Sequence, residues 1–301
     1  MADQGRYVLV GLGEILWDVF PTGKQLGGAP ANFAYHARAL GARGVPVSCI
    51  GDDMLGREIL DRLKELRLPS DYIAVDSEHP TGTVTIEVDD KGKPTYTIHE
   101  NVAWDFIPWS GGLAELAAGA DAVCFGSLCQ RRPVSRATIH NFLEVTKPDC
   151  IRVFDINLRQ SYFSKEVIQG ALERSDVLKL NDEELPVLGE LLGLGGAEGD
   201  IVSRVIEKYG LRVVALTRGP KGSELYTAGK VSKHGAFPTE VVDTVGAGDA
   251  FTAAITMGLL YHRTLDEIND FANRLAAFVC SQSGATPKLP DAIANHWIRR
   301  A

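Results

Sequence analysis

The chain has 301 residues, of which 45% are hydrophobic and 23% are charged, and its net charge is −8. This composition is typical of a globular protein and excludes a largely disordered chain. The acidic excess argues against a nucleic-acid partner or an anionic membrane surface, because no surplus of basic side chains exists to neutralise phosphates. An anionic substrate would therefore need a local positive pocket.

Cysteine content and the N-terminus both indicate a cytoplasmic protein. The five cysteines are an odd number and form no C-x-x-C pair. Most have apolar neighbours, which is typical of buried free thiols rather than of disulfides or a zinc site. Residues 1–6 contain no apolar signal core, and no apolar run approaches the ~18 residues of a membrane span. We expect no membrane partner.

The N-terminal region predicts alternating strands and helices. Tyr7–Leu12 is a short apolar run that ends at a glycine, which is typical of a buried strand. A helix should run from Pro30, at a first helical position, to the glycine at position 41. Val45–Ile50 predicts the next strand and Gly56–Leu66 the next helix.

A different pattern occupies Thr83–Ile98. Apolar and polar residues alternate on both sides of a turn at Asp89–Lys93. This alternation predicts an antiparallel hairpin with one face in water or over a ligand.

After residue 110, strand patterns alternate with helical patterns, which predicts a mostly parallel sheet covered on both faces. The strands are Ala122–Phe125, Ile151–Asp155, Val177–Leu180 and Val213–Thr217, and the helices are Ser135–Lys147, Lys165–Arg174 and Gly199–Tyr209. Leu191–Asp200 is rich in glycine and predicts a surface loop. Ligands of such sheets bind beyond the carboxyl ends of the strands. Candidate residues at those ends are Asn157, Arg159, Asn181, Glu184 and Gly219.

One segment favours an anion site. Asp243-Thr-Val-Gly-Ala-Gly-Asp249 precedes an apolar helix, Ala250–Leu260. Small residues allow close backbone approach, and the free amides and dipole of a helix start favour an anion. Asp249 could accept a proton from an attacking hydroxyl, and because phosphoryl-transfer transition states are loose, its pKa need not be raised for that task. A glycine-rich turn with a simple helix-start charge explains the segment equally well by itself.

Four motifs together resemble the ribokinase-like (PfkB) sugar kinases. They are Gly27-Gly-Ala-Pro-Ala-Asn32, Asn181-Asp-Glu-Glu184, Thr217-Arg-Gly-Pro-Lys-Gly222 and the Asp243–Asp249 segment with Ala250-Phe251. Their order and spacing are those of the family, and the resemblance covers residues 7–290. It implies a three-layer α/β fold with a mostly parallel central sheet and a small β-sheet lid.

The resemblance also implies a domain organisation. Residues 1–301 would form one kinase domain, with a lid made by about 14–28 and 82–100. Such a lid excludes water, since an open site would hydrolyse ATP. Its exposed strand edges would permit a homodimer.

The resemblance assigns the phosphate side of the site. Asp249 would be the catalytic base, and the amides of Gly246, Ala247 and Gly248 would form the anion hole. Asn181 and Glu184 would organise magnesium through its waters, although they also fit a helix capping box. Asp243 would be a structural partner or would contact a monovalent cation such as potassium.

The resemblance also assigns the ATP-binding residues. Thr217, Gly219 and Gly222 would lie along the nucleotide, whose phosphate also meets Gly248. Asn273 would contact the adenine, with an ordinary helix interior as the alternative.

On the sugar side, Asp18, Gly28 and Asn32 would contact hydroxyls, because a carboxylate and an amide can each make two hydrogen bonds to vicinal hydroxyls. Arg159, in a D-x-N-x-R segment, would contact substrate or phosphate, with an interdomain or surface salt bridge as the alternative. Ile156 replaces the proline expected in that segment.

The opening segments resemble the fructokinase branch most closely. We therefore expect ATP to phosphorylate D-fructose to fructose 6-phosphate. Alternatives are a 2-keto-3-deoxygluconate kinase, whose substrate carboxylate Arg159 could bind, and a ribokinase. A nucleoside kinase would need a larger apolar base pocket. A non-catalytic sugar sensor on the same fold is the alternative outside the enzymes.

Overall fold

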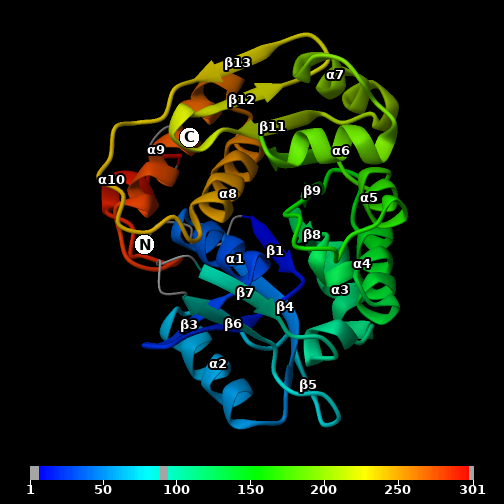
Figure 1. Ribbon diagram of the computed structural model, residues 1–301, viewed down its shortest axis with the longest axis vertical. Coiled ribbons are helices and arrows are strands. Elements are labelled where there is room, and N and C mark those ends of the chain that lie inside the picture. Colours follow the sequence, from blue (N-terminus) through cyan, green and yellow to red (C-terminus); the bar gives the residue numbers. More distant parts are fainter. Residues whose placement is uncertain (1–6, 89–93, 298–301) are drawn as a thin grey trace.

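One large sheet organises the molecule (Figure 1). The computed structural model describes residues 7–88 and 94–297, so residues 1–6 and the predicted turn at Asp89–Lys93 lie outside the described residues. Within the described residues the sheet has nine strands in the order β13-β12-β11-β10-β9-β8-β1-β4-β5. Their bounds are β1 (Val8–Leu12), β4 (Arg43–Gly51), β5 (Ile73–Asp76), β8 (Ala122–Gly126), β9 (Ile151–Asp155), β10 (Val177–Asn181), β11 (Val213–Thr217), β12 (Ser223–Tyr226) and β13 (Val231–His234).

Seven neighbouring strands of this sheet pair in parallel, in the spatial order β11-β10-β9-β8-β1-β4-β5. β12 and β13 add an antiparallel edge beside β11. The predicted, mostly parallel sheet is therefore confirmed. Its central strands are apolar on both faces, as parallel strands must be when helices cover both sides. In β1, Leu9 packs in one core while Val10 and Leu12 pack in the other.

Helices cover both faces and complete three layers. Figure 1 shows α1, α8 and α9 on one side and α3 to α7 on the other, in agreement with the two cores. Their bounds are α1 (Ala29–Ala39), α3 (Gly111–Gly119), α4 (Pro133–Val145), α5 (Lys165–Leu172), α6 (Glu184–Leu192), α7 (Glu198–Tyr209), α8 (Ala247–Leu260) and α9 (Leu265–Cys280). α2 (Met54–Glu65) packs against α1 in a third core, and α10 (Asp291–Ala294) follows α9.

A second sheet of four strands has the order β3-β2-β6-β7. The strands are β2 (Leu16–Phe20), β3 (Gly23–Gly27), β6 (Thr83–Val88) and β7 (Pro94–Ile98). β6 and β7 pair antiparallel, which confirms the predicted hairpin. Val84, Ile86 and Ile98 pack in the main core, while Tyr96, which pairs with Ile86, is exposed.

Two boundaries differ from the sequence prediction. The predicted loop Leu191–Asp200 is wrong at both ends, because Leu192 ends α6 and Glu198 begins α7. Gly193 ends α6 in the left-handed region, with φ of 67°, and the apolar side chains of Leu192 and Ile201 are buried. The glycines shorten the loop to residues 193–197 instead of extending it. α8 also begins three residues before the predicted start, at Ala247.

The order in which the chain adds strands to the sheet reverses between β1 and β8. From β1 the sheet grows through β4 to β5, and from β8 it grows through β9 toward β13. In open α/β sheets, ligands bind at such a switch point, outside the carboxyl ends of the strands. The residues that follow β1, β8, β9, β10 and β11 therefore line the place where a site is expected.

Within the described residues, none of the helices is both long and apolar enough to cross a membrane. The five cysteines carry free thiols, of which Cys280 is half-buried and the other four are buried. This confirms the expectation of buried free thiols for all but one of them.

Close packing of α1 on β1 predicts a strong effect of one added methyl group. A Cβ at Gly11 would lie 1.9 Å from the carbonyl oxygen of Pro30, so Gly11→Ala should lower the free energy of unfolding by about 1–3 kcal/mol through overpacking. Gly119→Ala is the control, because nothing lies within 4 Å of its added methyl group. Urea unfolding curves measure both, and equal midpoints for the two variants would contradict the packing argument.

Candidate active site

The N-terminus of α8 presents backbone amides at the carboxyl edge of the sheet. Gly246 caps the helix in the left-handed region, with φ of 78°. The amide of Ala247 donates to the Thr244 carbonyl at 3.3 Å, and within the described residues nothing accepts from the amides of Gly246 or Gly248. Unpaired amides at a helix start, together with the helix dipole, favour an anion.

Packing against a neighbouring loop holds this turn in place. A Cβ on Gly246 would lie 2.6 Å from the Cα of Ala285, so only glycine allows that contact. The carboxylate of Asp243 accepts from the amides of Val245 and Gly284, each at 3.0 Å. Asp243 thus bonds the turn to the neighbouring loop, which is a structural role and one of the two roles predicted for it.

Asp249 lies in the first turn of α8 and meets the glycine-rich motif near the N-terminus of the chain. Its Oδ2 accepts a hydrogen bond from Asn32 Nδ2 at 2.8 Å, across 217 residues of sequence. Burial, reinforced by the charge of Asp155, raises the pKa of Asp249 to about 6, although Asn32 and Lys179 act in the opposite direction. A carboxylate with this pKa is ionised at neutral pH and is a better base than an exposed aspartate.

A buried cation lies under the α8 turn. Lys179 Nζ is 3.1 Å from Asp155 Oδ1, and a Cβ on Gly248 would lie 3.2 Å from the same Nζ. Thr252 Oγ1 lies 3.0 Å from the other Asp155 oxygen. Burial lowers the pKa of Lys179, but neighbouring carboxylates, led by that of Asp155, outweigh burial and raise it, so the ammonium stays charged beneath the start of α8.

Lys179 and Asp155 were not among the predicted site residues. Their signal was present, because each is a charged residue within a mostly apolar, buried strand, and such residues are paired or functional.

The predicted sugar side of the site contains several carboxyl groups around Arg159. Burial raises the pKa of Asp18 to about 6 and that of Glu14 to about 7, and the charge of Arg159 opposes both shifts. Glu14 is 3% exposed, and its Oε2 has no hydrogen-bond partner. Gly28, the cap of α1, has φ of 110°, and a Cβ there would lie 2.4 Å from the Glu14 carbonyl oxygen. Glu14 was missed, although it is an isolated carboxyl in an apolar run.

Asn181 and Glu184 form the capping arrangement that was one of their two predicted roles. Asn181 Oδ1 accepts from the amides of Glu183 at 2.9 Å and Glu184 at 2.8 Å. Glu184 Oε2 accepts from the Asn181 amide at 2.8 Å. Within the described residues no group of three or more His, Cys, Asp and Glu could hold a metal ion. Asn181 and Glu184 thus bind backbone amides, and their magnesium role stays a prediction.

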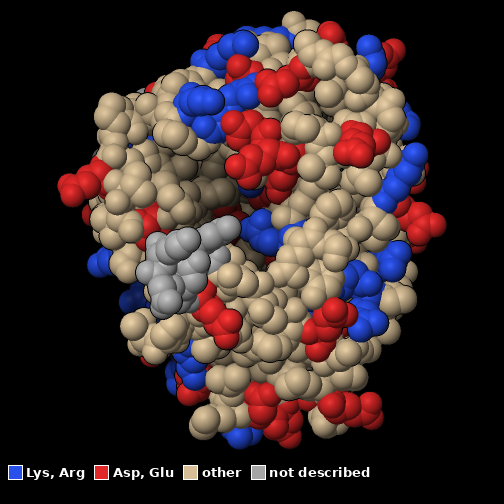
Figure 2. All heavy atoms as spheres, viewed as in Figure 1, with Lys and Arg blue, Asp and Glu red and all other residues tan. Residues whose placement is uncertain are grey.

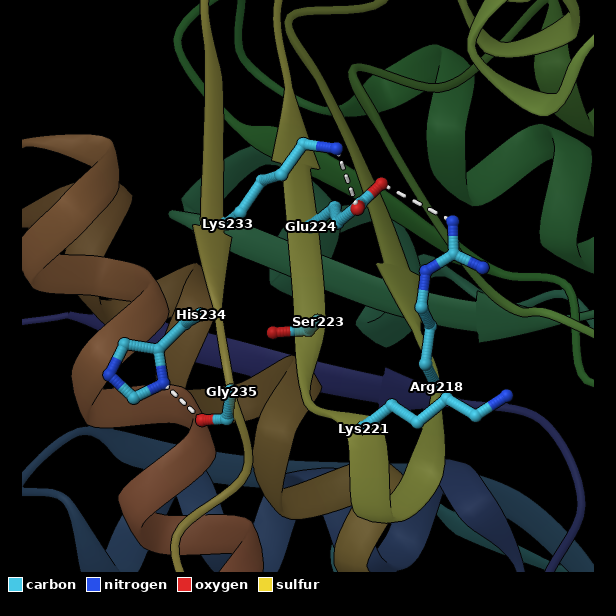
Figure 3. Close-up of a pocket in the computed structure, with 7 residues that line it drawn as sticks. All are labelled: Arg218, Lys221, Ser223, Glu224, Lys233, His234 and Gly235. Carbon is cyan, nitrogen blue, oxygen red and sulfur yellow. Dashed lines mark hydrogen bonds and ion pairs between the residues drawn. The ribbon is translucent and has the colours of Figure 1, made fainter.

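The predicted nucleotide loop connects β11 to β12. Thr217 ends β11, and Gly219 and Gly222 have φ of 51° and 94°. Beside this loop lies a pocket of about 200 Å³ (Figure 3). It is lined by Arg218, Lys221, Ser223, Glu224, Lys233, His234 and Gly235. Glu224 joins Arg218 and Lys233 in ion pairs.

Asn273 lies inside α9 and is 6% exposed. Its Nδ2 donates to Ser223 Oγ at 2.7 Å and to the Asn269 carbonyl at 2.8 Å. The structure thus places Asn273 in a buried network behind the nucleotide loop, in a helix interior. Contact with adenine stays a prediction.

The space-filling view shows a hollow on the face seen in Figure 1, with acidic groups at its upper rim and a basic group at its centre (Figure 2). The hollow therefore carries both basic and acidic groups. Of the predicted site residues, Asn32 bonds to Asp249, and the charge of Arg159 acts on the same carboxylate. Asn273 lies apart from them in α9.

The family model of the pfkB family carbohydrate kinases matches residues 11–292 of this chain. The chain belongs to this family. A fructokinase from Klebsiella pneumoniae is 31% identical, covering 92% of each chain. A putative sugar kinase from Pyrococcus horikoshii is 29% identical, covering 88% of this chain and 84% of the relative.

Solved structures of the family share the fold. The Pyrococcus horikoshii sugar kinase in complex with ATP has a TM-score of 0.80 at 26% identity and covers 93% of this chain and 94% of its own. A Vibrio cholerae fructokinase bound to fructose, ADP and calcium has a TM-score of 0.79 at 23% identity, covering 98% and 99%. The predicted ribokinase-like fold is confirmed.

Burial of Glu14 predicts a dependence of stability on pH. Its pKa rises from 4.5 to about 7 on folding, so its contribution to stability is fully present below pH 4.5 and is lost as the pH rises through 7. Glu14→Gln abolishes this loss. Relative to the wild type, the variant should gain up to about 3 kcal/mol in unfolding free energy between pH 4.5 and about pH 8.

Urea unfolding at the two pH values measures the difference. Glu190→Gln is the control, because Glu190 is exposed on α6, and its pH dependence should follow the wild type. A Glu14→Gln variant that loses stability with rising pH as steeply as the wild type would show that Glu14 is not desolvated.

Proposed function

We propose that this family member transfers the γ-phosphate of ATP to a hydroxyl of a ketose, with D-fructose, giving fructose 6-phosphate and ADP, as the preferred reaction. The observation that carries the proposal is the position of Asp249. Its carboxylate is desolvated, bonded to Asn32 at 2.8 Å, and located in the first turn of α8 beside unpaired amides. A base next to an anion site is the arrangement that phosphoryl transfer to a hydroxyl requires.

In the proposed reaction the acceptor hydroxyl attacks the γ-phosphorus. The new oxygen–phosphorus bond forms as the bond to the ADP oxygen breaks, and the hydroxyl proton passes to Asp249. The unpaired amides of Gly246 and Gly248 and the charge of Lys179 stabilise the transferring phosphate. Magnesium, when bound with ATP, would neutralise phosphate charge, and Asn181 and Glu184 would orient its waters.

Charge in the acceptor crevice favours a neutral sugar. One exposed arginine, Arg159, faces the carboxyl groups of Glu14, Asp18 and Asp249. A substrate carboxylate would add a further negative charge to this set, and juxtaposed like charges disfavour binding. This supports fructose over 2-keto-3-deoxygluconate. Fructokinase relatives at 29–31% identity support it independently.

The four-stranded sheet is proposed as the lid. One face of β6 and β7 packs on the core, and closure over the crevice would exclude water from the phosphoryl group. The same sheet is the proposed contact in a homodimer, since strand edges pair readily. We also propose that a monovalent cation such as potassium binds beside Asp243.

Asp249→Asn tests the base. The α8 amides are unchanged, so the affinity for ATP, measured by calorimetry, should stay within a few-fold of the wild type, while kcat should fall by about 10²–10⁴-fold. Because the pKa of Asp249 is about 6, kcat/KM of the wild type should fall as the pH drops below 6, where the base is protonated. A variant with near-normal turnover would refute the role of Asp249.

A sugar panel tests the substrate. With magnesium-ATP, ADP release should be fastest with fructose and slower with ribose, 2-keto-3-deoxygluconate and adenosine, because the crevice favours a neutral polyol. A coupled assay measures the release of ADP. If ADP release is fastest with 2-keto-3-deoxygluconate, that sugar acid and not fructose is the substrate. No ADP above background with any of the four would support a sugar sensor instead.

A further inference from the structure

Glu184 uses both carboxylate oxygens on backbone amides from two different strand ends. Oε2 accepts from Asn181, at the end of β10, at 2.8 Å. Oε1 accepts at 2.9 Å from Leu158, which follows β9 and lies 26 residues earlier in the chain. Glu184 is 7% exposed. A buried carboxylate with two amide donors is a rigid clamp, because charge-assisted hydrogen bonds are the stronger ones.

The segment that Glu184 holds has an unusual backbone. Asn157 and Gln160 have φ of 41° and 47°, a region that non-glycine residues adopt only when the surroundings impose it. Leu158 and Arg159 lie between them. The clamp on the Leu158 amide therefore acts at the centre of a strained turn, next to the residue that carries the positive charge of the acceptor crevice.

The far end of the same segment contacts the four-stranded sheet. Gln160 Nε2 donates to the Tyr96 carbonyl at 2.8 Å. The hydroxyl of Tyr162 donates to the Ile98 carbonyl at 3.2 Å. Tyr96 and Ile98 both belong to β7. Residues 157–162 therefore bond to Glu184 at one end and to the proposed lid at the other, with Arg159 between these contacts.

We propose that Glu184 is a positioning residue for the sugar, which acts by holding segment 157–162 so that Arg159 and β7 keep their places at the acceptor crevice. This role is separate from the magnesium role that the family resemblance implies, and its kinetic readout rests on the proposed function. The carboxylate then connects the two sides of the site. A change on the phosphate side at Glu184 alters how the sugar is bound.

Two variants break the clamp from opposite sides. Glu184→Gln keeps the shape of the side chain but has one acceptor oxygen, so it cannot hold both amides. Leu158→Pro removes the amide donor and leaves Glu184 and Asn181 intact, and it also disfavours the φ of 41° at Asn157, so it disturbs the same turn. Each should raise the KM for the sugar about tenfold, the size expected when a hydrogen bond to a charged group is lost. Combined in one chain, the two changes should have no more effect than the larger one, since they break the same contact.

Asn181→Ala is the matched control. It removes the side chain that bonds to the amides of Glu183 and Glu184 but leaves the acceptors of the Leu158 amide. It should change the magnesium and ATP dependence of turnover and leave the sugar KM within about two-fold, well below the tenfold that marks a lost charged hydrogen bond. Leu158→Pro should do the reverse, and this split separates positioning of the sugar from binding of the metal.

Hydrogen exchange of the ligand-free protein gives a readout that does not depend on turnover. In Glu184→Gln, peptides covering 156–163 and 94–98 should exchange faster than in the wild type, while peptides of β11 should not change. Unchanged exchange in 156–163, together with a sugar KM that stays at the wild-type value, would overturn the proposal. If the wild type phosphorylates no sugar, the proposed function fails, and the exchange result still decides whether Glu184 holds this segment.

Discussion

The rest of the site depends on one constraint, which is that charged side chains must leave water at the carboxyl edge of the sheet. Asp155, Lys179 and Glu184 are all at least nine-tenths buried there. An unpaired buried charge costs several kcal/mol, so each needs a partner of opposite charge or a hydrogen-bond donor. Lys179 pairs with Asp155, and backbone amides satisfy Glu184. The partners come from distant segments, and meeting this requirement brings those segments together.

The same constraint shapes the chemistry. In the proposed reaction, a phosphate above Lys179 and beside the α8 amides would replace its lost hydration with fixed donors, which need no reorganisation during the reaction. Because Asp249 is desolvated near Asp155, its pKa is raised to about 6, toward the value of an effective base at neutral pH. Asn32 keeps that carboxylate in place from α1. The proposed base and the proposed phosphate site therefore share one network.

Much of the fold was predictable because its signals are local. Largely apolar runs such as Ile151–Asp155 and Val213–Thr217 became strands with those bounds, since a strand buried on both faces consists mostly of apolar residues. The hairpin at residues 83–98 was predicted from its alternation. The loop at 191–200 was not, because its glycines indicated a long loop whereas burial of Leu192 and Ile201 extended both helices.

By itself the sequence determined the central strands of the large sheet, the hairpin of β6 and β7, most of the helices and the four motifs, including Asp249 and the glycines before it. These depend on side-chain periodicity and on backbone conformations that few residues adopt, so they can be read along the chain. Only the tertiary structure decided that Asn32 bonds to Asp249, that Lys179 lies under Gly248, and that Glu184 holds Leu158. These contacts join residues 26 to 217 positions apart or depend on the close approach of separate elements. No local pattern encodes which buried charge will meet which partner.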